Sequence, residues 1–189
     1  GKNSFYTTEN GSLNYYTIAT KEHKKVAGLE NFIVLDHIRK KNTIWSNSDC
    51  NLIDIGDGVV NLEWRTKMNS IGGEVLEGIQ QSIDIAEKNH TGLVIANQGS
   101  NFSVGANIAM IFMMAIEQEY EEIDFAVRAF QKTTGKIRNS SIPVVVATHG
   151  MTLGGGCEIA LHADHVQASA ETYIGLVEMG VGVIPGGGG

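Results

Sequence analysis

Hydrophobic and polar positions in the later part of the chain follow two different periods. Short apolar runs at 51–56, 59–64, 92–97 and 144–148 are typical of strands, and Asp57-Gly58 predicts a turn between the first two. Apolar residues at helical spacing predict helices over 70–90, 108–116 and 123–139. "HVQAS" and "TYIG" predict two further short strands. Strands that alternate with helices in this way predict an α/β fold.

The first part of the chain has a different pattern. "SFYTT" and "NYYTI" flank Asn10-Gly11, a strong signal for a β-hairpin. "GLENFIVLDHIRKKN" (28–42) predicts a short helix with an apolar face made of Leu29, Phe32, Ile33 and Leu35. "WSNSDCN" is a polar connector in which Trp45 is the expected anchor. We therefore expect an N-terminal part over residues 1–49 and a second domain over residues 50–189.

Composition narrows the class of partner. The 189 residues carry a net charge of -7, with +2 over residues 1–50 and -9 over the rest. An acidic body without a basic stripe argues against nucleic acid as the partner. No apolar run reaches the roughly 18 residues that a membrane span needs. Cys50 and Cys157 match no metal or redox spacing, and with a polar, leaderless start they favour a cytoplasmic location.

Three consecutive glycines, Gly154 to Gly156, stand before a predicted helix. The first N–H groups of a helix have no acceptor within it, so they can stabilise an oxygen that gains negative charge. Glycine lets the backbone itself become the contact surface for a ligand. Glu158 lies three residues after Gly155, on the same face of the helix. The alternative is a glycine-rich turn followed by an exposed helical glutamate.

Two further segments carry candidate chemistry. "NFSVGANI" (101–108) is a second glycine loop that leads into a helix, so the two loops could each present one N–H to a single oxygen. Glu178 is the one acid of the apolar segment "GLVEMGVGVIPGGGG". An apolar setting favours the protonated form of an acid, which suits a proton donor. A glutamate at a loop edge facing water is the alternative.

Taken in order, "FSVGAN … PVVVATHGMTLGGGCEIAL … ADHVQAS … GLVEMGVGVIPGGGG" resembles the enoyl-CoA hydratase (crotonase) superfamily over residues 51–189. The resemblance implies a crotonase-like spiral of repeated β-β-α units, truncated at its C-terminus and lacking the helices that close the acyl pocket and build a trimer. It implies that the N–H groups of Ala106 and Gly155 form the oxyanion hole. It also implies that Glu158 and Glu178 are the two catalytic carboxylates.

The same resemblance suggests which residues contact the substrate. Ser103, Gly105, Asn107 and Gly154 belong to the two loops, and "RTKMNSI" resembles the loop on the CoA side, with Met68 in it and Arg65 or Lys67 near phosphate. Either cation could equally be a solvated surface charge. Asn107 stands where the family usually has Asp but can still cap a helix, and Val177 stands where Pro often precedes the second Glu. "MIFMMAI" could line an acyl site, although helix core is the expected role.

The sequence is most similar to the hydratase part of bacterial bifunctional 3-hydroxyacyl-CoA dehydrogenase/enoyl-CoA hydratases. This implies addition of water across the 2,3 double bond of a 2-enoyl-CoA in fatty-acid β-oxidation, with residues 1–49 as the connector from a dehydrogenase portion. No GxGxxG follows a strand, so any NAD site lies outside these residues, and acyl-CoA is substrate rather than cofactor. An enoyl-CoA isomerase, or an inactive fragment, stays open as an alternative.

Other chemistries are less well supported. No glycine loop is followed by Lys-Ser or Lys-Thr, which excludes a P-loop. The sequence around Ser103 lacks the first glycine of a Gly-x-Ser-x-Gly elbow. His162 and His165 form an isolated H-x-x-H without a nearby third ligand, so we expect surface histidines and no metal.

Overall fold

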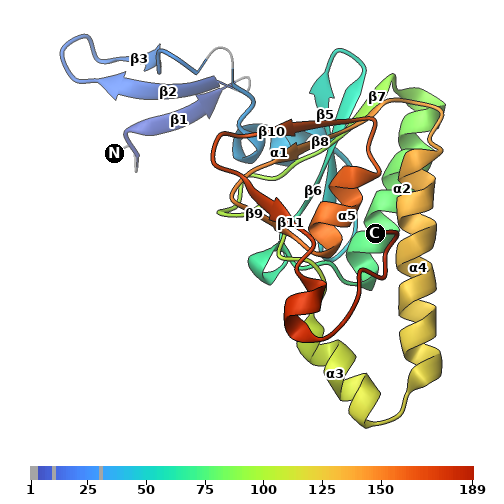
Figure 1. Cartoon of the computed structure of the whole chain (residues 1–189). Coiled ribbons are helices and arrows are strands. Elements are labelled where there is room, and N and C mark those ends of the chain that lie inside the picture. Colours follow the sequence, from blue (N-terminus) through green and yellow to red (C-terminus); the bar gives the residue numbers. More distant parts are fainter. Residues whose placement is uncertain (1–3, 10–11, 30–31) are drawn as a thin grey trace. The chain divides into compact units, whose positions relative to one another are not determined.

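A computed structural model describes residues 4–9, 12–29 and 32–189 of the chain (Figure 1). The chain divides into two compact units, Gly1–Thr43 and Ile44–Gly189. In the described ranges no helix combines the length and the apolar content that crossing a membrane requires.

The first unit contains a three-stranded antiparallel sheet in the order β1-β2-β3. Its strands are β1 (Tyr6–Glu9), β2 (Ser12–Thr17) and β3 (Glu22–Lys25). Tyr6 pairs with Tyr15, so the two predicted strands do pair as neighbours. The predicted Asn10-Gly11 turn lies outside the described residues. The third strand was not predicted, because "EHKK" is wholly polar and carries no strand signal.

The helix of the first unit is shorter than its apolar pattern suggests. α1 covers Leu35–Asn42, and Val34 before it has an extended backbone. Leu35 is buried, but the side chains of Phe32 and Ile33 are 68% and 51% exposed. The predicted apolar face over 28–42 is therefore wrong. Helical spacing stabilises a helix only where the apolar face packs against something.

The second unit is built on a six-stranded sheet in the order β10-β8-β7-β6-β5-β4. β4 (Thr43–Ser46), β5 (Cys50–Gly56) and β6 (Val59–Trp64) come first, followed by β7 (Gly92–Ile95), β8 (Val144–Thr148) and β10 (His165–Ala168). β5 and β6 are antiparallel, whereas β6, β7, β8 and β10 run parallel. Asp57 and Gly58 both have positive φ, which confirms the predicted turn.

The sheet begins earlier than the expected boundary at residue 49. β4 is an edge strand of the sheet, and Trp45 packs against the hydrophobic core as the predicted anchor. Because β4 pairs into this sheet, the predicted polar connector that begins at Trp45 belongs to the second unit. The two units divide after Thr43.

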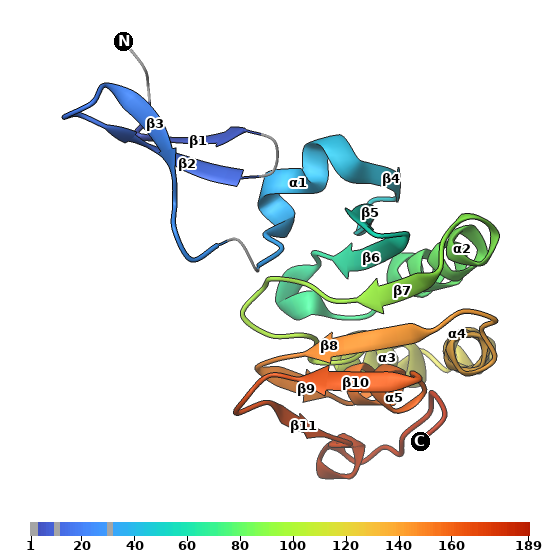
Figure 2. The same ribbon diagram turned by 90° about the horizontal axis from the view of Figure 1, so that it is seen from above.

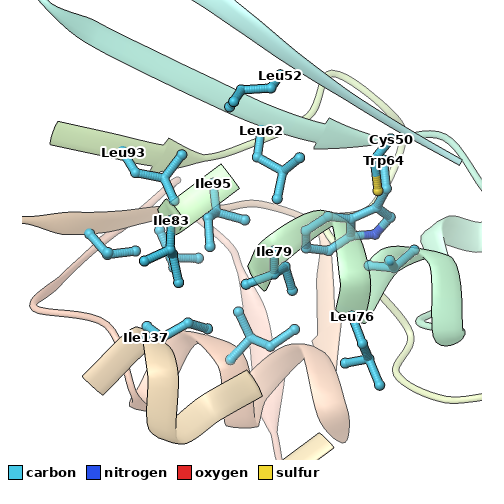
Figure 3. Close-up of a cluster of buried hydrophobic side chains, with 14 of the residues drawn as sticks. Cys50, Leu52, Leu62, Trp64, Leu76, Ile79, Ile83, Leu93, Ile95 and Ile137 are labelled. Carbon is cyan, nitrogen blue, oxygen red and sulfur yellow. The ribbon is translucent and has the colours of Figure 1, made fainter. Parts of the chain in front are cut away.

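Three helices cover the sheet. α2 (Gly73–Asn89) packs on β5, β6 and β7, α4 (Tyr120–Arg138) packs on α2, and α5 (Gly155–Leu161) contacts β8, β9, β10 and α4 (Figure 2). The core between helices and sheet contains the labelled side chains of Figure 3: Cys50, Leu52, Leu62, Trp64, Leu76, Ile79, Ile83, Leu93, Ile95 and Ile137. A two-stranded parallel sheet of β9 (Met151–Leu153) and β11 (Tyr173–Gly175) lies beside α5. The order β5-β6-α2 and β8-β9-α5 confirms an α/β fold with repeated β-β-α units.

One predicted core helix is not in the core. α3 (Ile108–Ile116) has no buried residue, and it packs mainly on α4. Its side chains at Met110, Phe112, Met113 and Ile116 are among the exposed large hydrophobics of the molecule. The prediction that "MIFMMAI" forms helix core is therefore wrong, because this helix packs mainly on α4 and leaves its large side chains exposed.

Candidate active site

The glycine run marks the start of α5, and each glycine there has a physical reason. Gly154 is the N-cap with φ 52° and ψ -124°, a conformation that side-chain-bearing residues avoid. A Cβ at Gly155 would lie 2.7 Å from Cζ of Phe130, and a Cβ at Gly156 would lie 2.8 Å from Cβ of Ser103. The glycines therefore allow this helix start to pack closely against its neighbours.

The second glycine loop lies directly against the first. Phe102 N donates to His149 O, and Leu153 N donates to Ser103 O. A Cβ at Gly105 would lie 2.9 Å from Leu153 O and 3.0 Å from Gly155 N. The structure thus brings together the two loops that the sequence predicted to meet.

The two expected oxyanion donors lie in closely packed, hydrogen-bonded loops. Gly105 N donates to the Ser103 hydroxyl, and Gly105 O accepts from Ile71 N, so the residue before Ala106 is held on both sides. Among the residues that the structure describes, the N–H groups of Ala106 and Gly155 have no hydrogen-bond acceptor. Unpaired N–H groups in adjoining loops can stabilise a developing oxyanion.

Glu158 is a buried carboxylate in the first turn of α5, with 3% of its surface exposed. Its Oε1 accepts hydrogen bonds from Gly187 N at 2.8 Å and Gly189 N at 3.0 Å. Thr134 on α4 donates its hydroxyl hydrogen to Gly187 O at 2.5 Å. The segment that contains Gly187 and Gly189 therefore passes between α4 and α5 (Figure 1). This acid is therefore fixed by the segment that follows the second acid.

Glu178 begins η2 (Glu178–Val181), a short 3-10 helix. A Cβ at Gly154 would lie 3.2 Å from Glu178 Oε1, so this carboxylate stands at the cap of α5. Within the described part of the chain its Oε2 is buried without a hydrogen-bond partner. A buried carboxylate oxygen without a partner is costly, which is typical of a group that meets a ligand.

The thiol of Cys157 lies near both acids. Burial raises the pKa of the Cys157 thiol, and the carboxylates of Glu178 and then Glu158 raise it further. Both acids therefore lie close enough to Cys157 to repel its thiolate. The candidate active site is this helix start with an acid on either side.

Two loop residues behave differently from the expectation. Ser103 is fully buried, and its hydroxyl donates to Asn69 O at 2.7 Å. Asn107 occupies the N-cap of α3, as predicted, but its side chain makes no capping bond. Its backbone ψ of 96° begins the helix without that bond.

The proposed CoA-side loop is exposed in its first part, before Asn69. Arg65 and Lys67 lie on the surface, and within the described ranges neither forms a salt bridge. Met68 is 52% exposed and has φ 57°. The geometry leaves both the phosphate-binding and the solvated roles open for these cations.

The supporting roles of two residues of the site were not predicted. Asn69 is buried with φ 51°, and its Nδ2 donates to Asn97 Oδ1 and Asn101 O, each at 2.9 Å. Asn tolerates positive φ better than most residues, which is the one hint in its identity. Phe130 is an ordinary apolar position of α4 in sequence, yet its ring lies against Gly155 and Gly187.

The histidine pair lies where α5 ends and β10 begins. His162 Nδ1 lies 2.8 Å from Glu158 O, one turn back in the same helix. No group of three or more potential metal ligands occurs in the part of the chain that the structure describes.

Known proteins are similar to this chain in both sequence and fold. The enoyl-CoA hydratase/isomerase family model matches residues 55–189. A Bacillus subtilis protein named "Probable 3-hydroxyacyl-CoA dehydrogenase" is 47% identical over 193 residues, which is 100% of this chain and 24% of that protein. A Rickettsia prowazekii protein named "Putative fatty acid oxidation complex trifunctional enzyme" is 31% identical, and the match covers 89% of this chain and 23% of that protein.

A solved structure agrees with these relatives. The enoyl-CoA hydratase from Bacillus anthracis has a TM-score of 0.66 and 26% identity, with 74% of this chain and 55% of that chain covered. The chain spans about a quarter of the length of the curated relatives it matches. The family match covers both glycine loops, both acids and strands β6, β7, β8 and β10 of the sheet, and the chain belongs to the enoyl-CoA hydratase/isomerase family.

Proposed function

We propose that the chain is an enoyl-CoA hydratase that adds water across the 2,3 double bond of a 2-enoyl-CoA. The observation that carries the proposal is the pair of carboxylates at one helix start. Glu158 lies in the first turn of α5, and Glu178 Oε1 lies beside its cap. Hydration moves two protons, one from water and one to the α-carbon, so two acids suit it better than one.

The chemistry can be written for these residues. A water oxygen attacks the β-carbon and passes a proton to the Glu158 carboxylate. Electrons move to the thioester oxygen, where the N–H groups of Ala106 and Gly155 stabilise the negative charge. Glu178 delivers a proton to the α-carbon as the carbonyl reforms. The product is the 3-hydroxyacyl thioester, and the acids exchange their protons before the next turnover.

The relatives support a wider context. Their names refer to a 3-hydroxyacyl-CoA dehydrogenase and a fatty acid oxidation complex, and each is about four times longer than this chain. We propose that residues 1–189 belong to a longer bifunctional chain of fatty-acid β-oxidation in the cytoplasm. A dehydrogenase would consume the 3-hydroxyacyl product, and its NAD would bind outside these residues.

An enoyl-CoA isomerase is the second candidate, and one observation favours it. Glu158 Oε1 already accepts two backbone N–H bonds, whereas Glu178 has a buried oxygen without a partner in the described residues. Isomerisation needs one acid to move a proton between two carbons. In that case Glu178 would act alone, and Glu158 would serve to hold the segment that contains Gly187 and Gly189.

The two candidates are separated by substrate. The complete natural protein that contains these residues is given crotonyl-CoA, and formation of 3-hydroxybutyryl-CoA is followed by mass. A parallel reaction with a 3-enoyl-CoA reports double-bond migration. We expect hydration with both acids required. Migration of the double bond without hydration would replace the hydratase proposal with the isomerase.

A further inference from the structure

We propose that Ser103 is a positioning residue. Its hydroxyl fixes the position of the Ala106 N–H relative to the Gly155 N–H in the oxyanion hole. The proposal rests on the proposed function, because it assigns those two N–H groups to a thioester oxygen. Ser103 itself is fully buried and so does not need to touch the substrate. Its role follows from what it holds in place.

One hydroxyl makes two hydrogen bonds at the base of the first loop. Ser103 Oγ donates to Asn69 O at 2.7 Å and accepts from Gly105 N at 3.1 Å. Gly105 directly precedes Ala106, so the peptide that carries the Ala106 N–H begins at a residue fixed by this hydroxyl. Gly105 has φ 85° and is held at its carbonyl by Ile71 N, which leaves few other conformations.

The acceptor of that hydroxyl is itself immobilised. Asn69 O also accepts from Trp64 Nε1 at 3.0 Å, at the end of the core strand β6. The Asn69 side chain is bonded to Asn97 and Asn101, just after β7. Satisfied buried networks of this kind are rigid, because breaking one bond leaves buried polar groups unpaired. The hydroxyl therefore fixes the position of the loop relative to the core sheet.

The same residue contacts the second loop. Ser103 N donates to Met151 O at 3.1 Å, and Ser103 O accepts from Leu153 N at 2.9 Å. A Cβ placed at Gly156, one residue after the Gly155 donor, would lie 2.8 Å from the Ser103 Cβ. Ser103 thus bonds to Gly105 and also packs against the start of α5.

The chain supplies a matched control. Thr152 forms a parallel bridge with Ser103 and is likewise fully buried. Its hydroxyl has no hydrogen-bond partner in the described part of the molecule. Thr152→Val therefore removes a buried hydroxyl from the same place without removing a hydrogen bond, whereas Ser103→Ala removes two.

Two measurements on the complete natural protein test the proposal. The first is kcat and KM for crotonyl-CoA hydration. The second is the infrared carbonyl stretch of bound butyryl-CoA, a saturated thioester that cannot react and whose frequency falls when an oxyanion hole polarises it. For Ser103→Ala we expect kcat to fall about 10- to 100-fold, less than for loss of a whole donor, with KM changed less than about threefold. The carbonyl band should return toward its value in water. Thr152→Val should leave kcat within about twofold.

The outcomes are distinct. An unshifted kcat and carbonyl band in Ser103→Ala overturn the proposal, as does an equal loss in Thr152→Val or a wild-type band that equals the band in water. If the wild type hydrates nothing but polarises the carbonyl in a Ser103-dependent way, the hydratase fails and the positioning role stands. If Ser103→Ala does not fold, Ser103→Cys preserves the volume with a weak acceptor. An intermediate band in that variant supports the role, and a wild-type band overturns it.

Discussion

The two carboxylates of the site lie on contrasting supports. Glu158 is part of α5, is almost fully buried, and has an oxygen bonded to two backbone N–H groups. Glu178 is in the short helix η2, whose residues are all at least partly exposed, and within the described residues its buried oxygen has no partner. Glu158 is thus an acid whose carboxylate is hydrogen-bonded within the fold, whereas Glu178 has a buried oxygen whose hydrogen-bonding capacity is unsatisfied in the described residues. The unsatisfied one is better suited to meet a substrate.

The largest expected effect is on turnover. Glu158→Gln and Glu178→Gln keep the shape of each side chain and remove its capacity to transfer a proton. If both acids move protons, each variant should lower kcat for crotonyl-CoA by about 100-fold or more, while acyl-CoA still binds. Steady-state hydration kinetics and a binding titration measure the two quantities. A Glu158→Gln variant of normal activity would reduce the pair to one working acid.

Stability should distinguish the acids in the opposite way. Glu158→Ala leaves the N–H groups of Gly187 and Gly189 without their acceptor and should cost about 1–3 kcal/mol. Glu178→Ala removes a carboxylate whose Oε2 has no partner in the described residues, and should be neutral or slightly stabilising. Urea unfolding measures both free energies. Equal losses would mean that the fold depends on the two acids alike.

A single methyl group tests how closely Glu178 lies against α5. At Gly154 the backbone has φ 52°, and the added Cβ would lie 3.2 Å from Glu178 Oε1. Gly154→Ala should cost about 1–3 kcal/mol through backbone strain and displace Glu178, so activity should fall as well. Gly135→Ala is the control, since nothing lies within 4 Å of its Cβ position in α4. That change should stabilise by about 0.5–1 kcal/mol, and thermal unfolding compares the two.

The smallest expected effect is a change in thiol ionisation. Glu178 and, to a lesser degree, Glu158 raise the pKa of the Cys157 thiol, so removing either charge should lower that pKa. Glu178→Gln should lower it more than Glu158→Gln does. Thiolate absorbance is titrated in a Cys50→Ala background, because the pKa of the Cys50 thiol is also raised, to about 12. A larger shift from Glu158→Gln would contradict the stronger influence of Glu178 on this thiol.

The fold could be predicted where periodicity and packing agree. Strands β5 to β8 and helix α2 follow their apolar patterns, because each apolar face meets another element of the core. α3 and the described part of the 28–42 segment have equally apolar patterns, but several of their large side chains are exposed. Burial is a property of the neighbouring element, so one segment's sequence could not show that Met110 and Phe32 would be exposed.

The site was predictable in its glycines and acids but not in its supports. Glycine runs and isolated acids stand out in sequence, and the structure does bring their loops together. Asn69, Thr134 and Phe130 are ordinary residue types at ordinary spacing. Their roles come from bonds and contacts to residues far along the chain, such as Asn69 to Asn97 and Thr134 to Gly187. Long-range contacts of this kind leave no local pattern.

The bonds from Gly187 and Gly189 to Glu158 have a consequence for the order of folding. They join residues 29 and 31 positions apart, whereas α5 itself is closed by bonds within one turn. Contacts between distant positions require a larger loop to close, which costs more chain entropy than a local turn. During refolding, the helix that carries Glu158 should therefore appear before the acid is held in place. Helical ellipticity should recover ahead of catalytic activity. The interval between the two should depend on how fast the segment that contains Gly187 and Gly189 docks between α4 and α5.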